Sequence, residues 1–136
     1  MWDHRRLTLD ERLDLTRNAF ARVSGLRAPD APLFILSAAS RHGEQAKRTL
    51  EIREGYNAMC RTFCESVDNA HFIDIDTLLQ PDEFADSDHY TRTGYFKIAD
   101  FVNNHPSLAA RVKAELPVEE PPKNRKNTKK LAAQAA

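Results

Sequence analysis

The chain has 136 residues, and its 20 basic side chains balance its 20 acidic ones. This length allows one small domain, and the balanced charge provides no global field to draw the protein toward nucleic acid or a membrane surface. Cys60 and Cys64 would share one face of a helix without the further ligands that a structural zinc site needs. We therefore expect two semi-buried thiols in a reducing compartment.

The two ends of the chain differ from the middle. Residues 117–136 contain no Phe, Tyr, Ile or Trp, so little apolar burial could offset the entropy of ordering them. We expect a folded part at 1–116 and a disordered basic tail at 117–136, whose lysines and arginine are too weak a signal for nucleic acid. The N-terminus lacks an apolar signal-peptide region and no run is long enough to span a membrane, which predicts a cytoplasmic protein for the chain as it stands.

A helix is expected first, over residues 7–25. Thr8 and Glu11 fit a capping box, and Gly25 marks the expected end. One face of this helix is apolar, with the members Leu9, Leu13, Phe20 and Val23.

Two apolar runs with a long helix between them follow. Residues 33–37 are a short continuous apolar run, typical of a strand covered on both faces. A helix is expected at 44–66, with a second strand at 70–76 and a loop at 77–88. The buried stripe of this helix is predicted to be Ile52, Tyr56, Met59 and Phe63.

The chain is expected to end its fold with helices at 93–103 and 107–115, the first with one face formed by Tyr95, Ile98, Ala99 and Val102. Two strands joined through a long helix predict a parallel pair with a right-handed crossover, hence an α/β fold. Two parallel strands make a poor sheet with a bare apolar edge. Either another chain covers that edge, or an upstream half of the domain is missing.

The stretch FADSDHYTRTGYFKIADFV (84–102) contains the best candidate for chemistry. Asp86 and His89 follow the second strand, at the sheet end where function collects in parallel α/β folds. A carboxylate beside a histidine orients the imidazole and stabilises its protonated form. Asp88 is a rival for that role, less well spaced in an extended loop. The alternative is that Asp86 only caps the backbone before a helix.

This stretch resembles the last conserved block of SGNH (GDSL-type) hydrolases, in which Asp-x-x-His precedes a glycine and a helix; Asp86, His89 and Gly94 match it. The resemblance implies a partial three-layer α/β/α, flavodoxin-like fold whose serine attacks an ester. His89 would move the serine proton and Asp86 would orient His89. The substrate of the parent protein would be an ester or an acylated carbohydrate, with acyl transfer to a polysaccharide as a variant.

The family's nucleophile motif, Gly-Asp-Ser, and its Gly-x-Asn-Asp motif for oxyanion donors are absent from the sequence. Because losing the nucleophile costs orders of magnitude in rate, the chain is expected to be inactive alone.

Three other interpretations stay open. A non-catalytic α/β remnant could bind a partner, a second copy or a complementing chain, through the bare sheet edge and the basic tail. An enzyme could instead use Ser37 or Ser40, although neither lies in a Gly-x-Ser-x-Gly elbow. His71, Asp74, Asp76 and Asp88 could be read as metal ligands, but their spacing matches no oxygen-rich loop. We expect neither a metal nor a cofactor.

Overall fold

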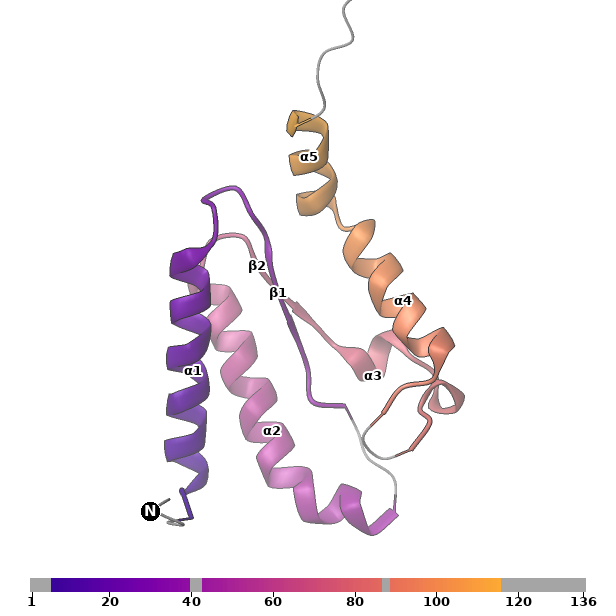
Figure 1. The fold of residues 1–136 in the computed structure, drawn as a ribbon. Helices are drawn as coiled ribbons and strands as arrows, with labels where there is room; N and C mark the ends of the chain where they lie inside the picture. The colour runs from indigo at the N-terminus through magenta and orange to yellow at the C-terminus, as the bar shows by residue number, and fades with distance from the viewer. Residues whose placement is uncertain (1–5, 40–42, 87–88, 116–136) are drawn as a thin grey trace, which may run out of the picture.

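The computed structural model describes residues 6–39, 43–86 and 89–115 (Figure 1). The elements, in chain order, are α1 (Leu9–Leu26), β1 (Leu33–Leu36), α2 (Gly43–Ser66), β2 (Ala70–Ile73), α3 (Ile75–Leu78), the 3-10 turn η1 (Pro81–Glu83), α4 (Arg92–Asn103) and α5 (Pro106–Glu115). This order confirms the predicted α/β class. The predicted tail at 117–136, and the candidates Ser40 and Asp88, lie outside the described residues.

The sheet consists of β1 and β2, which pair in parallel as predicted, with Leu33 opposite Ala70 and Leu36 opposite Ile73. The prediction of a second strand over 70–76 was too long. The strand ends at Ile73 because Asp74 caps α3: its carboxylate accepts the backbone N–H of Asp76 at 3.1 Å. The predicted loop at 77–88 accordingly contains the end of α3 and all of η1.

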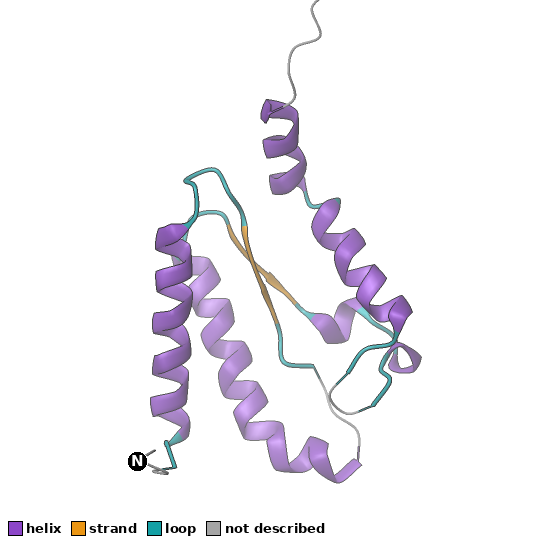
Figure 2. Cartoon of the chain, in the orientation of Figure 1, coloured by secondary structure: helices purple, strands orange, loops and turns teal. Residues whose placement is uncertain are grey.

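Helices flank both faces of this small sheet (Figure 2). On one face Ile35 joins a core with the α2 residues Met59, Cys60 and Phe63, against which α1 also packs. On the other face Ile73 joins Ile75 and Leu79 in a core that α4 covers, with further contacts from Phe34, Leu36, Ile98 and Val102. Two strands covered on both sides fit the α/β prediction, and a full three-layer sandwich would need more strands than the described residues form.

The start of α1 is as predicted, and its end lies close to the predicted one. Thr8 Oγ1 accepts the N–H of Glu11 at 3.2 Å, and Glu11 Oε2 accepts the N–H of Thr8 at 2.9 Å, which confirms the capping box. The helix includes Gly25 and ends at the next residue, Leu26, so Gly25 lies near its end as expected. The chain turns at Arg27, whose guanidinium donates to the carbonyls of Ala31 at 2.7 Å and Asn69 at 2.9 Å and so joins the starts of both strands.

The predicted apolar faces were too wide. Val23, Ile52 and Tyr95 are 52%, 45% and 54% exposed, and Ala99 is exposed as well. Helical spacing identifies the side of a helix that can be buried, whereas the size of the sheet decides how much of it is covered. A sheet of two four-residue strands is short beside α1 and α2, so parts of their apolar faces extend past it.

Candidate functional site

The loop that carries Asp86 and His89 is closed like a small hairpin. Phe84 and Tyr90 form an antiparallel bridge across its base, and the N–H of Ala85 donates to the carbonyl of His89 at 2.9 Å. The aromatic rings of Phe84 and Tyr90 also contact each other edge to face, with 5.6 Å between centroids. The two candidate residues are therefore fixed by a bridged loop directly before α4.

Gly94 sets how closely α4 approaches this loop. Thr91 is the N-cap of α4, its Oγ1 accepting the N–H of Gly94 at 3.2 Å, and its own N–H donates to the carbonyl of Glu83 at 2.7 Å. A Cβ on Gly94 would lie 2.7 Å from that same carbonyl oxygen. The glycine of the motif thus has a packing role, because only a residue without a side chain fits against the backbone of η1.

A buried carboxylate supports the same junction. Lys97 Nζ lies 2.6 Å from Glu83 Oε1, and the N–H of Gln80 donates to Glu83 Oε2 at 2.7 Å. The hydrogen bond from Lys97, followed by that from Gln80, lowers the pKa of Glu83. This ion pair joins η1 to α4 beneath the loop.

Asp86 contacts His89 through both the ring and the backbone. Nδ1 of His89 lies 2.9 Å from each carboxylate oxygen of Asp86, and the backbone N–H of His89 donates to Oδ1 at 2.8 Å. A carboxylate accepts only, so Nδ1 carries the hydrogen and Nε2 keeps its lone pair in the neutral ring. Asp86 therefore makes the ring contact that an orienting role requires and also bonds a backbone N–H in the loop, while the cap of α4 itself is Thr91.

The pair is open to water. The side chains of His89 and Asp86 are 68% and 58% exposed, so water screens their attraction. Nε2 of His89 makes no hydrogen bond to any residue in the described ranges. The ring is therefore accessible to a substrate or to another polypeptide, but the described residues do not enclose it in the dry site that strengthens electrostatic catalysis.

Ser37 has a structural role, as a buried hydrogen-bond acceptor. It is buried, 6% exposed, and its Oγ accepts the N–H of Ile75 at 2.8 Å, which connects the end of β1 to α3. The structure brings it into no hydrogen bond with His89. The interpretation of Ser37 as a nucleophile therefore has no base beside it in the part of the chain that is described.

The two cysteines and the possible metal ligand Asp74 also have contacts typical of a structural role. Cys60 is fully buried and burial raises its pKa; burial likewise raises the pKa of Cys64, so neither thiol is activated. Asp74 pairs with Arg61 at 3.2 Å besides capping α3. Within the described ranges no three His, Cys, Asp or Glu side chains group as a metal site would require.

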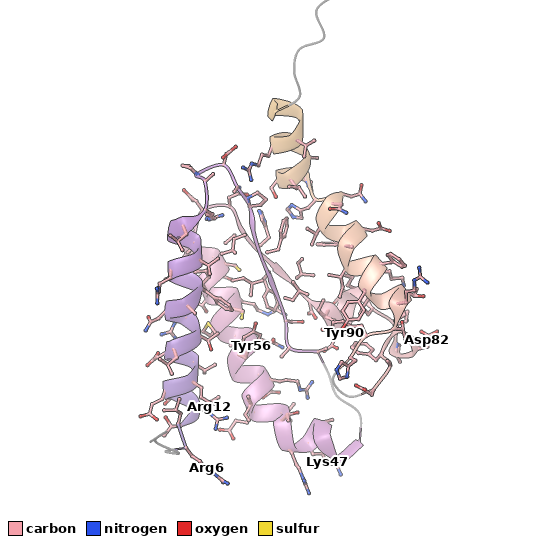
Figure 3. The ribbon with its side chains drawn as sticks, in the orientation of Figure 1. Arg6, Arg12, Lys47, Tyr56, Asp82 and Tyr90 are labelled. Atoms are coloured by element: carbon pink, nitrogen blue, oxygen red, sulfur yellow. The ribbon has the colours of Figure 1, made fainter. Side chains whose placement is uncertain are left out.

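A pocket of about 540 Å³ lies beside the loop, at the carboxyl end of β1. Its walls come from α1 and α2, and Phe84 and Tyr90 from the base of the loop also line it. Figure 3 labels Arg12 on α1, Tyr56 on α2 and Tyr90 near the loop, all three around this pocket. The site thus consists of an exposed acid–base pair and an adjoining cavity.

Two polar residues of α2 that hold the backbone beside this pocket were missed from the sequence: Tyr56, which lines it, and Asn57, which bonds the lining residue Ala38. Tyr56 was assigned only to an apolar stripe, yet its O–H donates to the carbonyl of Leu36 at 3.2 Å. Asn57 donates to the carbonyl of Ala38 at 3.2 Å and accepts its N–H at 2.7 Å. Tyr56 thus bonds the last residue of β1, and Asn57 bonds the backbone two residues beyond it. No local pattern in the sequence signals such contacts.

Comparison with protein-family models, with curated proteins and with solved structures finds no match to this chain. The resemblance to SGNH hydrolases therefore stays an expectation from the sequence, carried mainly by the Asp-x-x-His block. No helix in the described ranges has the length and apolar character to cross a membrane.

Proposed function

We propose that this chain supplies the base and its orienting carboxylate to a serine-hydrolase site that acts on esters. The observation that carries the proposal is the contact of Asp86 with Nδ1 of His89, which leaves Nε2 as the basic atom. Nε2 would take the proton of a serine hydroxyl as its oxygen attacks the acyl carbon. It would then return that proton to the leaving alkoxide, while Asp86 stays ionised and stabilises the imidazolium.

The serine would come from a polypeptide segment beyond this sequence. Leu33 and Ser37 direct their N–H groups to β2, so the intervening Phe34 and Leu36 direct theirs to the opposite edge of β1. Tyr56 and Asn57 of α2 bond the backbone at the carboxyl end of that edge. A complementing strand would therefore pair at Phe34. In a parallel arrangement the loop after it would emerge on the same side as His89, as α/β folds require.

A second candidate is a non-catalytic module that binds a partner, or a second copy, through the same strand edge. The exposure of Asp86 and His89 favours it, because an exposed pair can serve binding as readily as catalysis. Acyl transfer to a polysaccharide, rather than hydrolysis, stays a prediction for the parent protein. A cytoplasmic location and the absence of nucleic-acid binding also stay predictions from the sequence.

Hydrolysis of a short-chain p-nitrophenyl ester tests the proposal. The chain alone should show no ester hydrolysis that depends on His89, so the wild-type and His89→Ala chains should give the same background rate. A form extended upstream in its reading frame to include Gly-Asp-Ser should give turnover that His89→Ala and Asp86→Asn reduce by at least a hundredfold, with Asp88→Asn as the matched control. His89-dependent turnover by the chain alone would mean that the nucleophile lies within this sequence. If an extended form showed no His89-dependent turnover, the hydrolase proposal would be wrong and the non-catalytic binding module would be the better interpretation.

A further inference from the structure

The pocket beside the loop has apolar walls of defined origin. Leu9 and Leu13 of α1 line it, and both side chains also lie against Gly55 of α2. Leu36 from β1 and Ile52 from α2 continue the apolar surface. A volume of about 540 Å³ falls in the range of cavities that enclose a small organic molecule.

The charge of this pocket is positive. Arg12 on α1 and Arg53 on α2 line it, and none of the described residues that line it is acidic. Arg12 forms no ion pair with any residue in the described ranges, and Arg53 donates to the carbonyl of Ala46 at 3.4 Å. Two guanidinium groups above an apolar wall suit one carboxylate, which each can bind through two parallel hydrogen bonds.

The other polar groups of the pocket restrict the chemical class of ligand that it can bind. The hydroxyl of Tyr56 is directed to the backbone of β1, and burial raises the pKa of Tyr90, so neither phenol supplies negative charge at the pocket. A cation would meet two guanidinium groups and no acidic side chain among the described lining residues. A wholly apolar ligand would remove water from Arg12 without compensation. An anionic head with an apolar tail satisfies both surfaces.

We propose that this pocket binds an aliphatic carboxylate, a fatty acid of roughly eight to twelve carbons, as sized by the cavity. The carboxylate lies at Arg12 and Arg53, and the chain lies along Leu13, Leu36 and Ile52. This binding does not depend on the hydrolase chemistry proposed for His89.

Titration of decanoate, below its micelle concentration, into the full 136-residue chain tests the proposal by ¹⁵N-resolved NMR. Saturable shifts should concentrate at the pocket residues. Decanol should bind at least about tenfold more weakly, and Arg12→Gln should weaken decanoate by a similar factor, because a charge-assisted pair is lost. Arg22→Gln, on an exposed position of the same helix, is the matched control and should bind as the wild type does.

Equal affinity for decanol and decanoate would overturn the proposal, as would an unchanged affinity in Arg12→Gln. Tighter binding of decyl phosphate than of decanoate would overturn the choice of a carboxylate. The same shifts on raising the protein concentration without ligand would show a second copy in the pocket instead. His89→Ala should bind decanoate normally, so failure of the hydrolase proposal and failure of this one are distinguishable.

Discussion

Replacing Gly94 by alanine is the perturbation for which the structure gives the sharpest expectation. The new Cβ would lie 2.7 Å from the carbonyl oxygen of Glu83, 3.2 Å from Cβ of Tyr90 and 3.4 Å from a methyl of Leu79. The first contact is with backbone, so it is relieved only if α4 moves away from η1. That movement lengthens the hydrogen bond from Thr91 to Glu83, now 2.7 Å.

The expected loss follows from three effects. Overpacking costs about 1–3 kcal/mol, and weakening the bond to Glu83 costs up to about 1 kcal/mol. Alanine in place of glycine inside a helix returns about 0.5–1 kcal/mol. Gly94→Ala should therefore lower the free energy of unfolding by about 2 kcal/mol, within a range of about 0 to 3.5 kcal/mol, measured by urea denaturation followed by circular dichroism.

Gly55→Ala is the matched control. This glycine also lies inside a helix, but its new Cβ would meet only side-chain methyls, at 3.4 Å from Leu13 and 3.5 Å from Leu9, an ordinary contact distance. It should stabilise the protein by about 0.5–1 kcal/mol. A Gly94→Ala protein as stable as Gly55→Ala would refute the reasoning, because Gly94 would then not be fixed by the close approach of α4 to Glu83.

Three further expectations concern stability. Ser37→Ala should cost about 1–3 kcal/mol in urea denaturation, because it leaves the N–H of Ile75 without its acceptor; no loss would show that this bond is dispensable. Thr8→Ala should cost about 1 kcal/mol by removing the cap of α1, with helix loss seen by circular dichroism. Burial, followed by His105 and Arg27, lowers the pKa of His71 from its ordinary 6.5. The unfolded chain then takes up the proton first, so stability should fall as the pH drops below 6.5 toward the lower folded-state pKa. His71→Gln should flatten that slope, and an unchanged slope would contradict the assignment.

The sequence predicted what depends on neighbouring residues. The capping box at Thr8 and Glu11 and the contact between Asp86 and His89 each span three positions, so local spacing was sufficient. The parallel pairing of the strands followed from the length of the crossover. The early end of β2 is not evident from the sequence, because Ile73 and Ile75 continue the alternation that is typical of a strand. The cap that Asp74 provides to α3 is nevertheless a local contact.

The contacts that build the pocket join positions far apart in the chain. Asn57 bonds Ala38 across 19 residues, Tyr56 bonds Leu36 across 20, and Ser37 bonds Ile75 across 38. Each depends on where α2 and α3 settle on the sheet, which packing decides and periodicity does not. For the same reason the apolar spacing of Val23 and Ile52 indicated a face but not its coverage.

Asp86 holds His89 with its hydrogen on Nδ1 and its lone pair on Nε2. Long-range ¹H–¹⁵N NMR of the imidazole, in buffer near pH 9 where histidine side chains are neutral, measures this tautomer directly. We expect the His89 ring to be the Nδ1–H tautomer in the wild-type protein and in Asp88→Asn, and to lose that preference in Asp86→Asn. A dominant Nε2–H form in the wild-type protein, or loss of the Nδ1–H form in Asp88→Asn alone, would contradict this expectation.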